Sequence, residues 1–212
     1  PEFGLIPPFR FIPIFEENGF ISKLDYYVWE CACNVLGDWK ERGFNMLPVS
    51  VNVSRVHLNN DNFLTVLDEL VEKYGIEKKY LELEITESVE GEHLTRMTEL
   101  AKKHGYTLLM DDFGSGYSSL NTLKSTKFDV LKIDRAFLSS FLNDEKGKKI
   151  ISHTISMSKD VGLGLIAEGV ETLEQAKFLQ DCGCDIAQGY YYAKPMPVQE
   201  AEGYLTKPEN RK

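Results

Sequence analysis

An apolar run that ends at two adjacent aspartates constrains the fold of this chain more than any other stretch. Residues 107–110 predict a strand buried on both faces, and Gly114 and Gly116 permit tight turns in the loop that follows. Asp111 and Asp112 therefore stand at the carboxyl end of that strand. Because neighbouring strand residues point to opposite faces, both carboxylates can address one site only where the chain is already turning. From this stretch alone, a metal site and a simple helix cap formed by Asp112 are equally favoured.

Helix and strand patterns alternate along the rest of the chain. Proline at positions 1, 7, 8 and 13 predicts an irregular lead-in over residues 1–23. Apolar residues that recur at every second position predict strands, and those at helical spacing predict helices. The expected strands span residues 47–54, 80–86, 107–110, 130–134, 164–168 and 185–192. The expected helices span residues 24–43, 63–71, 94–104, 118–124, 150–161, 173–179 and 201–205.

Periodicity also predicts which side chains share a face. In the first helix the apolar positions with helical spacing are Tyr27, Val28, Cys31, Val35 and Trp39. In the first strand one face carries Val49, Val51 and Val53. In the second strand Leu81, Leu83 and Ile85 stand opposite Glu82, Glu84 and Thr86.

The alternation of strands and helices predicts an α/β fold with parallel strands and right-handed crossovers. An open doubly wound sheet and a TIM-like (β/α)₈ barrel both fit, and six visible strands are two fewer than a barrel needs. One polar residue lies at or near the end of each strand: Asn52, Glu84, Asp111, Lys132, Glu168 and Gln188. A barrel gathers such residues from several strands at one mouth, whereas an open sheet uses a single switch point. The barrel is favoured.

The donor atoms at this mouth indicate metal-assisted chemistry. Asn52, Glu84, Asp111 and Asp112 supply only oxygen ligands, which suit Mg²⁺ or Mn²⁺. Two such ions could share a bridging aspartate, stabilise the attacking and leaving oxygens of a displacement at phosphorus, and activate a water near neutral pH.

Lys132 and Glu168 each have a catalytic and a structural interpretation. Lys132 could orient the attacking water or offset developing charge, but for a lysine considered alone an ion pair with Asp134 or a neighbouring carboxylate is favoured. Glu168 could bind metal or accept the proton of the water. It could instead be structural, in a turn where Glu171 caps the next helix.

Composition excludes several classes of protein. The chain has 24 Lys and Arg against 33 Asp and Glu, and its net charge of −9 includes no basic cluster, which argues against DNA binding and broad nucleic-acid binding. No apolar run approaches the length of a membrane span, and the start lacks the parts of a signal peptide. We therefore expect a soluble, cytoplasmic domain without membrane contact. Cys31, Cys33, Cys182 and Cys184 lack zinc-site spacing and are expected to be four buried or partly buried thiols.

Seven motifs in a fixed order give the chain a specific family resemblance. They are Gly4-Leu-Ile-Pro-Pro with Phe11-Ile-Pro, Val51-Asn-Val-Ser54, Leu83-Glu-Ile-Thr-Glu87, the segment Asp111-Asp-Phe-Gly-Ser-Gly-Tyr-Ser-Ser-Leu120, Leu131-Lys-Ile-Asp134, Ala167-Glu-Gly-Val-Glu171 and Gln188-Gly-Tyr190. Together they resemble the EAL domain family of bacterial phosphodiesterases, which linearise the second messenger cyclic di-GMP to pGpG. Ser115 and Ala136 replace a commoner threonine and serine, which are mild departures.

The resemblance implies a role for each matching position. It implies metal ligation by Asn52, Glu84, Asp111 and Asp112, with Asp111 as the bridge between two Mg²⁺ or Mn²⁺ ions. It also implies that Lys132 contacts the catalytic water, and that Glu168 and Gln188 complete the second metal and water environment. Glu87 matches the glutamate that steadies the loop after Asp112. Tyr190 and Pro195, with the rest of the 195–197 segment, resemble the edge of the guanine pocket.

The resemblance also implies what this chain lacks. The Glu-Ala-Leu motif that names the family would lie just upstream of Pro1, together with two strands. Residues 1–212 would then be a single EAL domain truncated at the N-terminus to about six strands, the C-terminal four fifths of the whole. A barrel without these strands exposes edges and lacks a ligand, so we expect the chain alone to be inactive or severely impaired.

Two alternatives to the enzyme remain open. One is a non-catalytic cyclic di-GMP receptor of the same fold, although such receptors usually lose residues equivalent to Asp111, Lys132 or Glu168. The other is a Mg²⁺-assisted lyase or isomerase that uses Lys132 as a base, which does not explain Asn52 beside the aspartates. The partners implied are cyclic di-GMP, a second copy in a homodimer, and sensor or diguanylate cyclase (GGDEF) domains in the parent protein.

Overall fold

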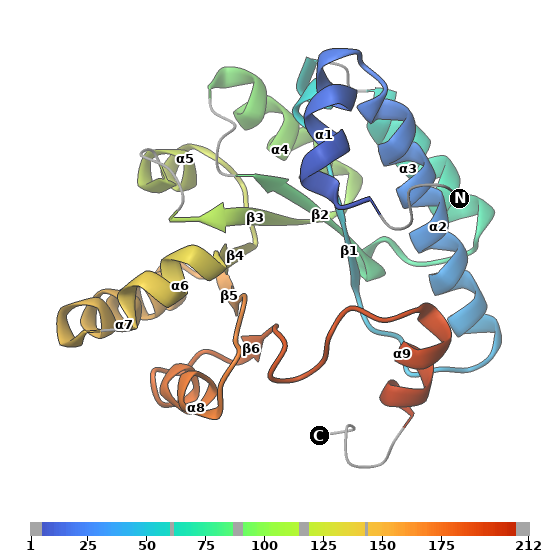
Figure 1. Cartoon of the computed structure of the whole chain (residues 1–212). Coiled ribbons are helices and arrows are strands. Elements are labelled where there is room, and N and C mark those ends of the chain that lie inside the picture. Colours follow the sequence, from blue (N-terminus) through green and yellow to red (C-terminus); the bar gives the residue numbers. More distant parts are fainter. Residues whose placement is uncertain (1–5, 60–61, 87–90, 115–118, 143, 207–212) are drawn as a thin grey trace. The chain divides into compact units, whose positions relative to one another are not determined.

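A computed structural model describes residues 6–59, 62–86, 91–114, 119–142 and 144–206 of the chain (Figure 1). The chain divides into two compact units, Pro1–Lys132 and Ile133–Lys212, and each is described by itself. Within both units, strands alternate with helices along the sequence.

The first unit runs from the first helix to the fourth strand. Its helices are α1 (Pro8–Glu17), α2 (Ile21–Glu41), α3 (Asn62–Lys73), α4 (Glu92–His104) and α5 (Ser119–Ser125), with the short 3-10 helices η1 (Arg55–Asn59) and η2 (Lys78–Tyr80). Its strands are β1 (Val49–Asn52), β2 (Leu81–Thr86), β3 (Thr107–Phe113) and β4 (Val130–Ile133), whose last residue belongs to the second unit. β1 pairs with β2 and β2 with β3, both in parallel, and Figure 1 shows α2 and α3 along one side of β1 and β2.

The second unit continues the same alternation. Its helices are α6 (Arg135–Phe141), α7 (Glu145–Asp160), α8 (Leu173–Asp181) and α9 (Val198–Leu205), and its strands are β5 (Gly164–Ala167) and β6 (Ile186–Ala187). β5 and β6 pair in parallel, with Ala167 opposite Ala187. The amide of Glu168 donates to the carbonyl of Ile133 at 3.0 Å, which ties the end of β5 to the end of β4.

The predicted α/β class with parallel strands is confirmed, and the described residues contain the six strands that the sequence predicted. The face prediction for β2 is also confirmed, because Leu81, Leu83 and Ile85 are at most 1 % exposed. In β3, Leu108, Leu109 and Met110 are all at most 1 % exposed, so this strand is buried on both faces as predicted. Each such side chain contributes about 1.5–3 kcal/mol to folding.

The prediction of an irregular lead-in over residues 1–23 was wrong for the described part, because α1 occupies residues 8–17 and α2 begins at Ile21, while residues 1–5 lie outside the described residues. Pro8 lies in the first turn of α1, where a missing amide costs no helical hydrogen bond. Pro13 lies inside the helix, which is tolerated beside contacts between the rings of Phe11, Phe15 and Phe20.

The predicted apolar face of the first long helix is confirmed only in part, because Trp39 is buried and Val35 is half-buried. Tyr27 and Val28 are 66 % and 41 % exposed, and Cys31 is exposed as well. The residues that face the core follow a second pattern at spacings of three and four: Ile21, Asp25, Trp29, Cys33 and Leu36. Two sets of residues in this helix have helical spacing. The buried set contains Asp25, so the sequence did not clearly indicate that this set faces the core.

Two further elements differ from the prediction. The expected strand over residues 185–192 is reduced to Ile186–Ala187, because the chain turns at Gly189 and the Tyr191 amide donates to the carbonyl of Val170. Helix α6 was not predicted. It begins at Arg135, and the side chain of the preceding Asp134 caps it by accepting hydrogen bonds from the amides of Ala136 and Phe137 at 2.7 and 3.2 Å.

The four cysteines are free, and they differ in exposure. Cys33 and Cys184 are buried and Cys182 is half-buried, but Cys31 is exposed, which corrects the prediction for that residue. Burial raises the pKa of the Cys33 thiol to about 11, so this thiol stays protonated and unreactive at neutral pH. Across the described residues, every helix is too short or too polar to span a membrane.

Candidate functional site

A buried lysine joins two of the predicted metal ligands in the first unit. Lys132 Nζ lies 2.7 Å from Glu84 Oε1 and 3.0 Å from Asp111 Oδ1. The side chains of Lys132, Glu84 and Asp111 are 6 %, 9 % and 14 % exposed. One ammonium group therefore neutralises part of the charge of two carboxylates that come from different strands.

Strand register brings these side chains together. Asn52 of β1 is the register partner of Glu84 in β2, and Asp111 of β3 is the partner of Thr86. Glu84 and Thr86 lie two positions apart and so share a face of the sheet, and register partners point to the same face. Asn52, Glu84 and Asp111 consequently belong to one face near the carboxyl ends of three adjacent strands.

Asp111 has an incompletely satisfied oxygen. Oδ1 is buried and, although it lies 3.0 Å from Lys132 Nζ, it makes no hydrogen bond of acceptable angle within the described part of the chain. A buried carboxylate oxygen without a hydrogen bond is costly, at about 1–3 kcal/mol or more. The Lys132 ammonium supplies a positive charge beside this oxygen, and a metal cation could act as a further partner.

The donor chemistry fits a hard divalent cation. The amide oxygen of Asn52 and the carboxylates of Glu84, Asp111 and Asp112 are ligands that suit Mg²⁺ and Mn²⁺. In the residues that the structure describes, no three His, Cys, Asp or Glu side chains form a ready metal-binding group. Lys132 instead contacts the two carboxylates, so a cation that bound here would share them with the lysine.

Asp112 lies near the end of β3 and departs from extended backbone geometry. Its φ is +58°, and it is the one residue other than glycine with a positive φ in the described chain. Aspartate and asparagine adopt this left-handed conformation more readily than most residues do. The strand is longer than predicted, because β3 continues to Phe113, and the positive φ of Asp112 falls inside it. The alternative of a helix cap involves residues 115–118, which lie outside the described residues.

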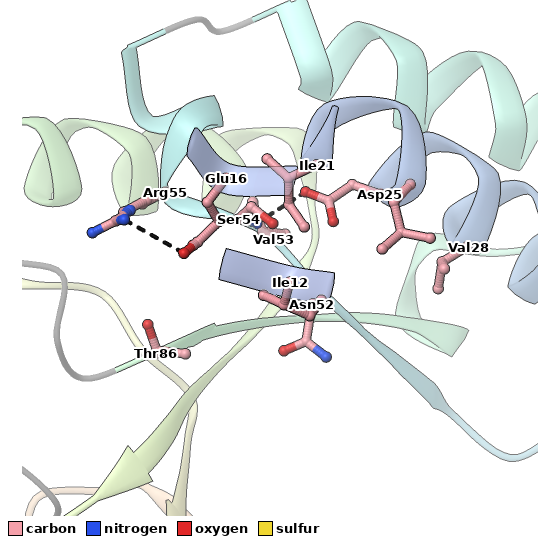
Figure 2. Close-up of a pocket in the computed structure, with 11 residues that line it drawn as sticks. Ile12, Glu16, Ile21, Asp25, Val28, Asn52, Val53, Ser54, Arg55 and Thr86 are labelled. Carbon is pink, nitrogen blue, oxygen red and sulfur yellow. Dashed lines mark hydrogen bonds and ion pairs between the residues drawn. The ribbon is translucent and has the colours of Figure 1, made fainter. Parts of the chain in front are cut away.

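A pocket of about 480 Å³ opens beside Asn52 and Thr86 in the first unit (Figure 2). Its polar lining includes Asp25 of α2, Glu16 of α1, and Ser54 and Arg55 just after β1. Arg55 and Glu16 form an ion pair at 3.4 Å across its edge. The pocket therefore places hydrogen-bond acceptors and one cation next to a predicted metal ligand.

Trp29 fixes the backbone that carries Asn52. Its Nε1 donates a hydrogen bond of 2.9 Å to the Asn52 carbonyl oxygen, and the tryptophan is fully buried. The end of β1 is held from its other side as well, because the Val53 amide donates to the Glu84 carbonyl at 2.8 Å. The position of Asn52 thus depends on both α2 and β2.

Replacement of Trp29 by phenylalanine is expected to lower the free energy of unfolding by about 1–3 kcal/mol, because a part-buried carbonyl loses its donor. Thermal denaturation followed by circular dichroism measures this change. Phe63→Leu, which alters a neighbouring buried ring with no polar atom, controls for lost packing volume. A Trp29→Phe variant as stable as the wild type would show that the hydrogen bond is dispensable.

In the second unit, three predicted residues line one cavity. Gln188, Tyr190 and Pro195 border a largely apolar space of about 440 Å³ that also includes Met196 and Tyr204. Tyr190 is 58 % exposed, and Lys194 Nζ lies over its ring, 5.6 Å from the ring centroid. The amide of Gln188 donates to the Ala167 carbonyl at 2.8 Å, which holds Gln188 directly after β6.

Glu168 and the turn that follows it are also in the second unit. Glu168 is half-buried at the end of β5. The alternative in which Glu171 caps the next helix was wrong, because Thr172 is the cap of α8 and its side chain accepts from the Gln175 amide. Glu171 pairs with Arg135 at 2.7 Å. The structural interpretation of Lys132 named an ion pair with Asp134 or a neighbouring carboxylate. Lys132 pairs with the neighbouring carboxylates Glu84 and Asp111, and Asp134 is instead the cap of α6.

Gly189 allows Gln188 and Tyr190 to reach this cavity. A Cβ atom at Gly189 would lie 2.2 Å from the carbonyl oxygen and 2.3 Å from the amide nitrogen of Val170. Val170 is at that point hydrogen-bonded on both sides, from its amide to the Gln188 carbonyl and from the Tyr191 amide to its own carbonyl. No side chain fits between these two backbone segments.

Gly189→Ala is therefore expected to destabilise the second unit by about 2–3 kcal/mol, as overpacking against fixed backbone does. Gly203→Ala is a matched control, because nothing lies within 4 Å of its Cβ position and alanine favours helix α9. Thermal denaturation followed by circular dichroism compares the two variants. Equal melting temperatures would contradict the proposed close contact.

The sequence did not indicate Asp25, Trp29 and His57 as parts of a site. A buried aspartate at helical spacing with Ile21 and Trp29 was the available signal, since a charged residue on a core-facing stripe must have partners. Glu87 and the loop of residues 115–118 lie outside the described residues, so the predicted contact between them stays a prediction.

Comparison with known proteins places these features in a family. The EAL domain model matches residues 1–195. A cyclic di-GMP phosphodiesterase, NbdA of Pseudomonas aeruginosa, is 34 % identical over 208 residues, and the oxygen sensor protein DosP of Escherichia coli is 32 % identical over 209. Both matches cover 97 % of this chain but only 27 % and 26 % of those proteins. The chain spans about a quarter of the length of these relatives.

Solved structures agree with the sequence matches. The PaMucR phosphodiesterase in complex with cyclic di-GMP is 32 % identical, with a TM-score of 0.87 over 95 % of this chain and 83 % of that one. The EAL domain of Mycobacterium smegmatis DcpA is 34 % identical, with a TM-score of 0.81 over 87 % of this chain and 84 % of that one. The chain thus shares the α/β fold of EAL domains, with six parallel strands in the described residues.

Proposed function

Because the chain belongs to the EAL domain family, we propose that it binds cyclic di-GMP and that the intact domain, within a larger signalling protein, hydrolyses this nucleotide to linear pGpG. The observation that carries the proposal is the joint contact of Glu84 and Asp111 with Lys132, together with the unsatisfied Asp111 oxygen. The chain carries several of the acidic and basic groups that phosphodiester hydrolysis with two cations uses.

The chain's own residues have distinct parts in this proposal. Asn52, Glu84, Asp111 and Asp112 would hold Mg²⁺ or Mn²⁺, which supplies Lewis-acid stabilisation of the phosphoryl oxygens and a nucleophilic water near neutral pH. Lys132 offsets the charge of two carboxylates that would otherwise repel the anionic substrate. Glu168 would accept a proton from the water, and Gln188 would orient that water by hydrogen bonding.

The two pockets suit different parts of a guanine nucleotide. In the first unit, Asp25 and Glu16 offer carboxylate acceptors for the N1 proton and 2-amino group of a guanine base. In the second unit, Tyr190 and Pro195 provide flat apolar surface on which a base can stack. Each assignment can be tested by itself.

The signalling context completes the proposal. Cyclic di-GMP is a cytoplasmic second messenger, so we place the domain in the cytoplasm, next to sensor or GGDEF domains of its parent protein. We also propose that it forms a homodimer through the surface that follows Asp112. A light-scattering mass equal to one chain at high protein concentration would contradict the dimer.

Hydrolysis and binding are tested separately. Calorimetric titration of the purified chain with cyclic di-GMP, with and without Mn²⁺, measures binding. Chromatography of the products, using the longest natural polypeptide that contains the chain, measures cleavage to pGpG. Binding with cleavage supports the enzyme, and binding without cleavage supports a receptor of the same fold. Absence of binding contradicts both and leaves the lyase or isomerase.

A further inference from the structure

A buried imidazole to which the proposed function gives no role is paired with Asp25, one of the residues that line the pocket of the first unit. His57 and Asp25 are 3 % and 6 % exposed, and His57 Nε2 lies 3.0 Å from Asp25 Oδ2. The Ser54 amide donates to the same oxygen at 3.2 Å. Since a buried carboxylate is retained only when it is well hydrogen-bonded, these two donors account for its presence in the core.

Aromatic rings hold the imidazole in one orientation. The ring centroid of His57 lies 5.4 Å from that of Tyr26, 5.0 Å from Trp29 and 5.5 Å from Phe63. Trp29 and Phe63 are fully buried, so His57 has little room to change rotamer. Its Nε2 therefore faces Asp25 in a fixed direction.

Both hydrogen bonds end on Oδ2, which leaves the other oxygen of Asp25 to the pocket. Oδ1 accepts no hydrogen bond from the described residues, and it is not among their buried, unpartnered atoms. Asp25 lines the pocket, and Figure 2 shows one of its oxygens toward Ser54 while the second points away from it. A side chain more than nine-tenths buried thus offers a single open acceptor beside Asn52.

We infer that His57 is a positioning residue for ligand recognition, because it fixes Asp25 so that Oδ1 accepts a hydrogen bond from an N–H group of the bound base. The inference deepens the proposed function and rests on cyclic di-GMP as the ligand. His57 itself does not touch the ligand. It makes the pocket selective for bases with an amino or imino donor at this point, and guanine is such a base.

Affinity and selectivity test the inference together. The probes are cyclic di-GMP and its inosine analogue, which lacks the 2-amino donor, and calorimetry gives both dissociation constants. His57→Leu is expected to weaken cyclic di-GMP binding about tenfold, the effect of one misplaced hydrogen bond to a charged group. It is also expected to remove most of the preference for guanine. His57→Gln retains a donor and should restore both values to within about threefold.

Phe63→Leu separates positioning from packing. It disturbs the same aromatic surroundings without touching Asp25, so it should lower the melting temperature while leaving the preference for guanine unchanged. If Phe63→Leu and His57→Leu lose the preference equally, or if His57→Gln fails to restore it, His57 has only a structural role and the inference is overturned.

A ligand-free measurement keeps the inference separate from the proposed function. Long-range ¹H–¹⁵N spectra report whether His57 Nε2 carries a proton, and ¹³C spectra report the Asp25 carboxyl group. A wild-type chain that binds neither nucleotide contradicts the proposed function. In that case a protonated Nε2, with an Asp25 signal displaced in His57→Leu, still supports the positioning role. An unprotonated Nε2 or an unchanged Asp25 signal overturns it.

Discussion

Replacement of Lys132 by methionine is expected to lower the free energy of unfolding of the first unit by about 3–5 kcal/mol. The substitution keeps most of the side-chain volume but removes the ammonium group between Glu84 and Asp111. Two largely buried carboxylates then remain without their cation, and the resulting penalty exceeds what the ion pair itself contributes. For a chain of this length the melting temperature should fall by about 10 °C.

Tryptophan fluorescence is a suitable probe of this change. Both tryptophans of the chain, Trp29 and Trp39, belong to the first unit and are buried. Lys103→Met is the matched control, because Lys103 is exposed on α4 and its replacement removes the same charge. The control should melt within about 1 °C of the wild type, as surface substitutions usually do.

Neutralising the two carboxylates tests the cause. In the Lys132→Met background, Glu84→Gln and Asp111→Asn should together recover at least half of the lost stability, since they remove the unpaired charges. A Lys132→Met variant that is as stable as Lys103→Met would refute the buried ion pair. Failure of the double replacement to restore stability would assign the loss to packing instead.

Asp111→Asn is expected to reduce the affinity of the chain for Mn²⁺ by about a hundredfold, the effect of removing one charged ligand from a site with few others. The amide keeps the shape of the side chain but lacks the negative charge that now faces Lys132 at 3.0 Å. Electron paramagnetic resonance of free Mn²⁺ during a titration measures the affinity without any need for catalysis.

The melting temperature with and without Mn²⁺ tests the same prediction independently. Saturating Mn²⁺ should raise the melting temperature of the wild type, because a cation that binds only the folded state stabilises it. The Asp111→Asn chain should show little change. Glu99→Gln, which removes one exposed negative charge on α4, should behave like the wild type. Equal Mn²⁺ affinity in all three proteins would exclude Asp111 as a ligand.

The strands and their polar ends could be predicted because short-range patterns determine them. Buried strands require continuous or alternating apolar residues, and β2 and β3 satisfy this rule almost residue by residue. Glu84, Asp111 and Lys132 stood out because a charged residue at the end of an apolar strand must be paired. Their mutual distances could not be predicted, since these depend on the register between strands.

Other features depend on tertiary contacts that leave a weak local signal. The buried stripe of α2 includes Asp25, which is stable there only because Ser54 and His57 supply donors from a distant segment. The two-residue length of β6 follows from the contact between Gly189 and Val170, which are 19 positions apart in the sequence. Helix α1 tolerates Pro13 where local propensity predicts a break.

The backbone conformation of Asp112 restricts which sequences can replace it. At a φ of +58°, glycine, asparagine and aspartate are the residues that fit with little steric penalty, and β-branched residues fit worst. Of these three, aspartate alone brings a negative charge. In a library of random substitutions at position 112, correctly folded variants should therefore be few. Among these variants, the ones with full activity should carry aspartate.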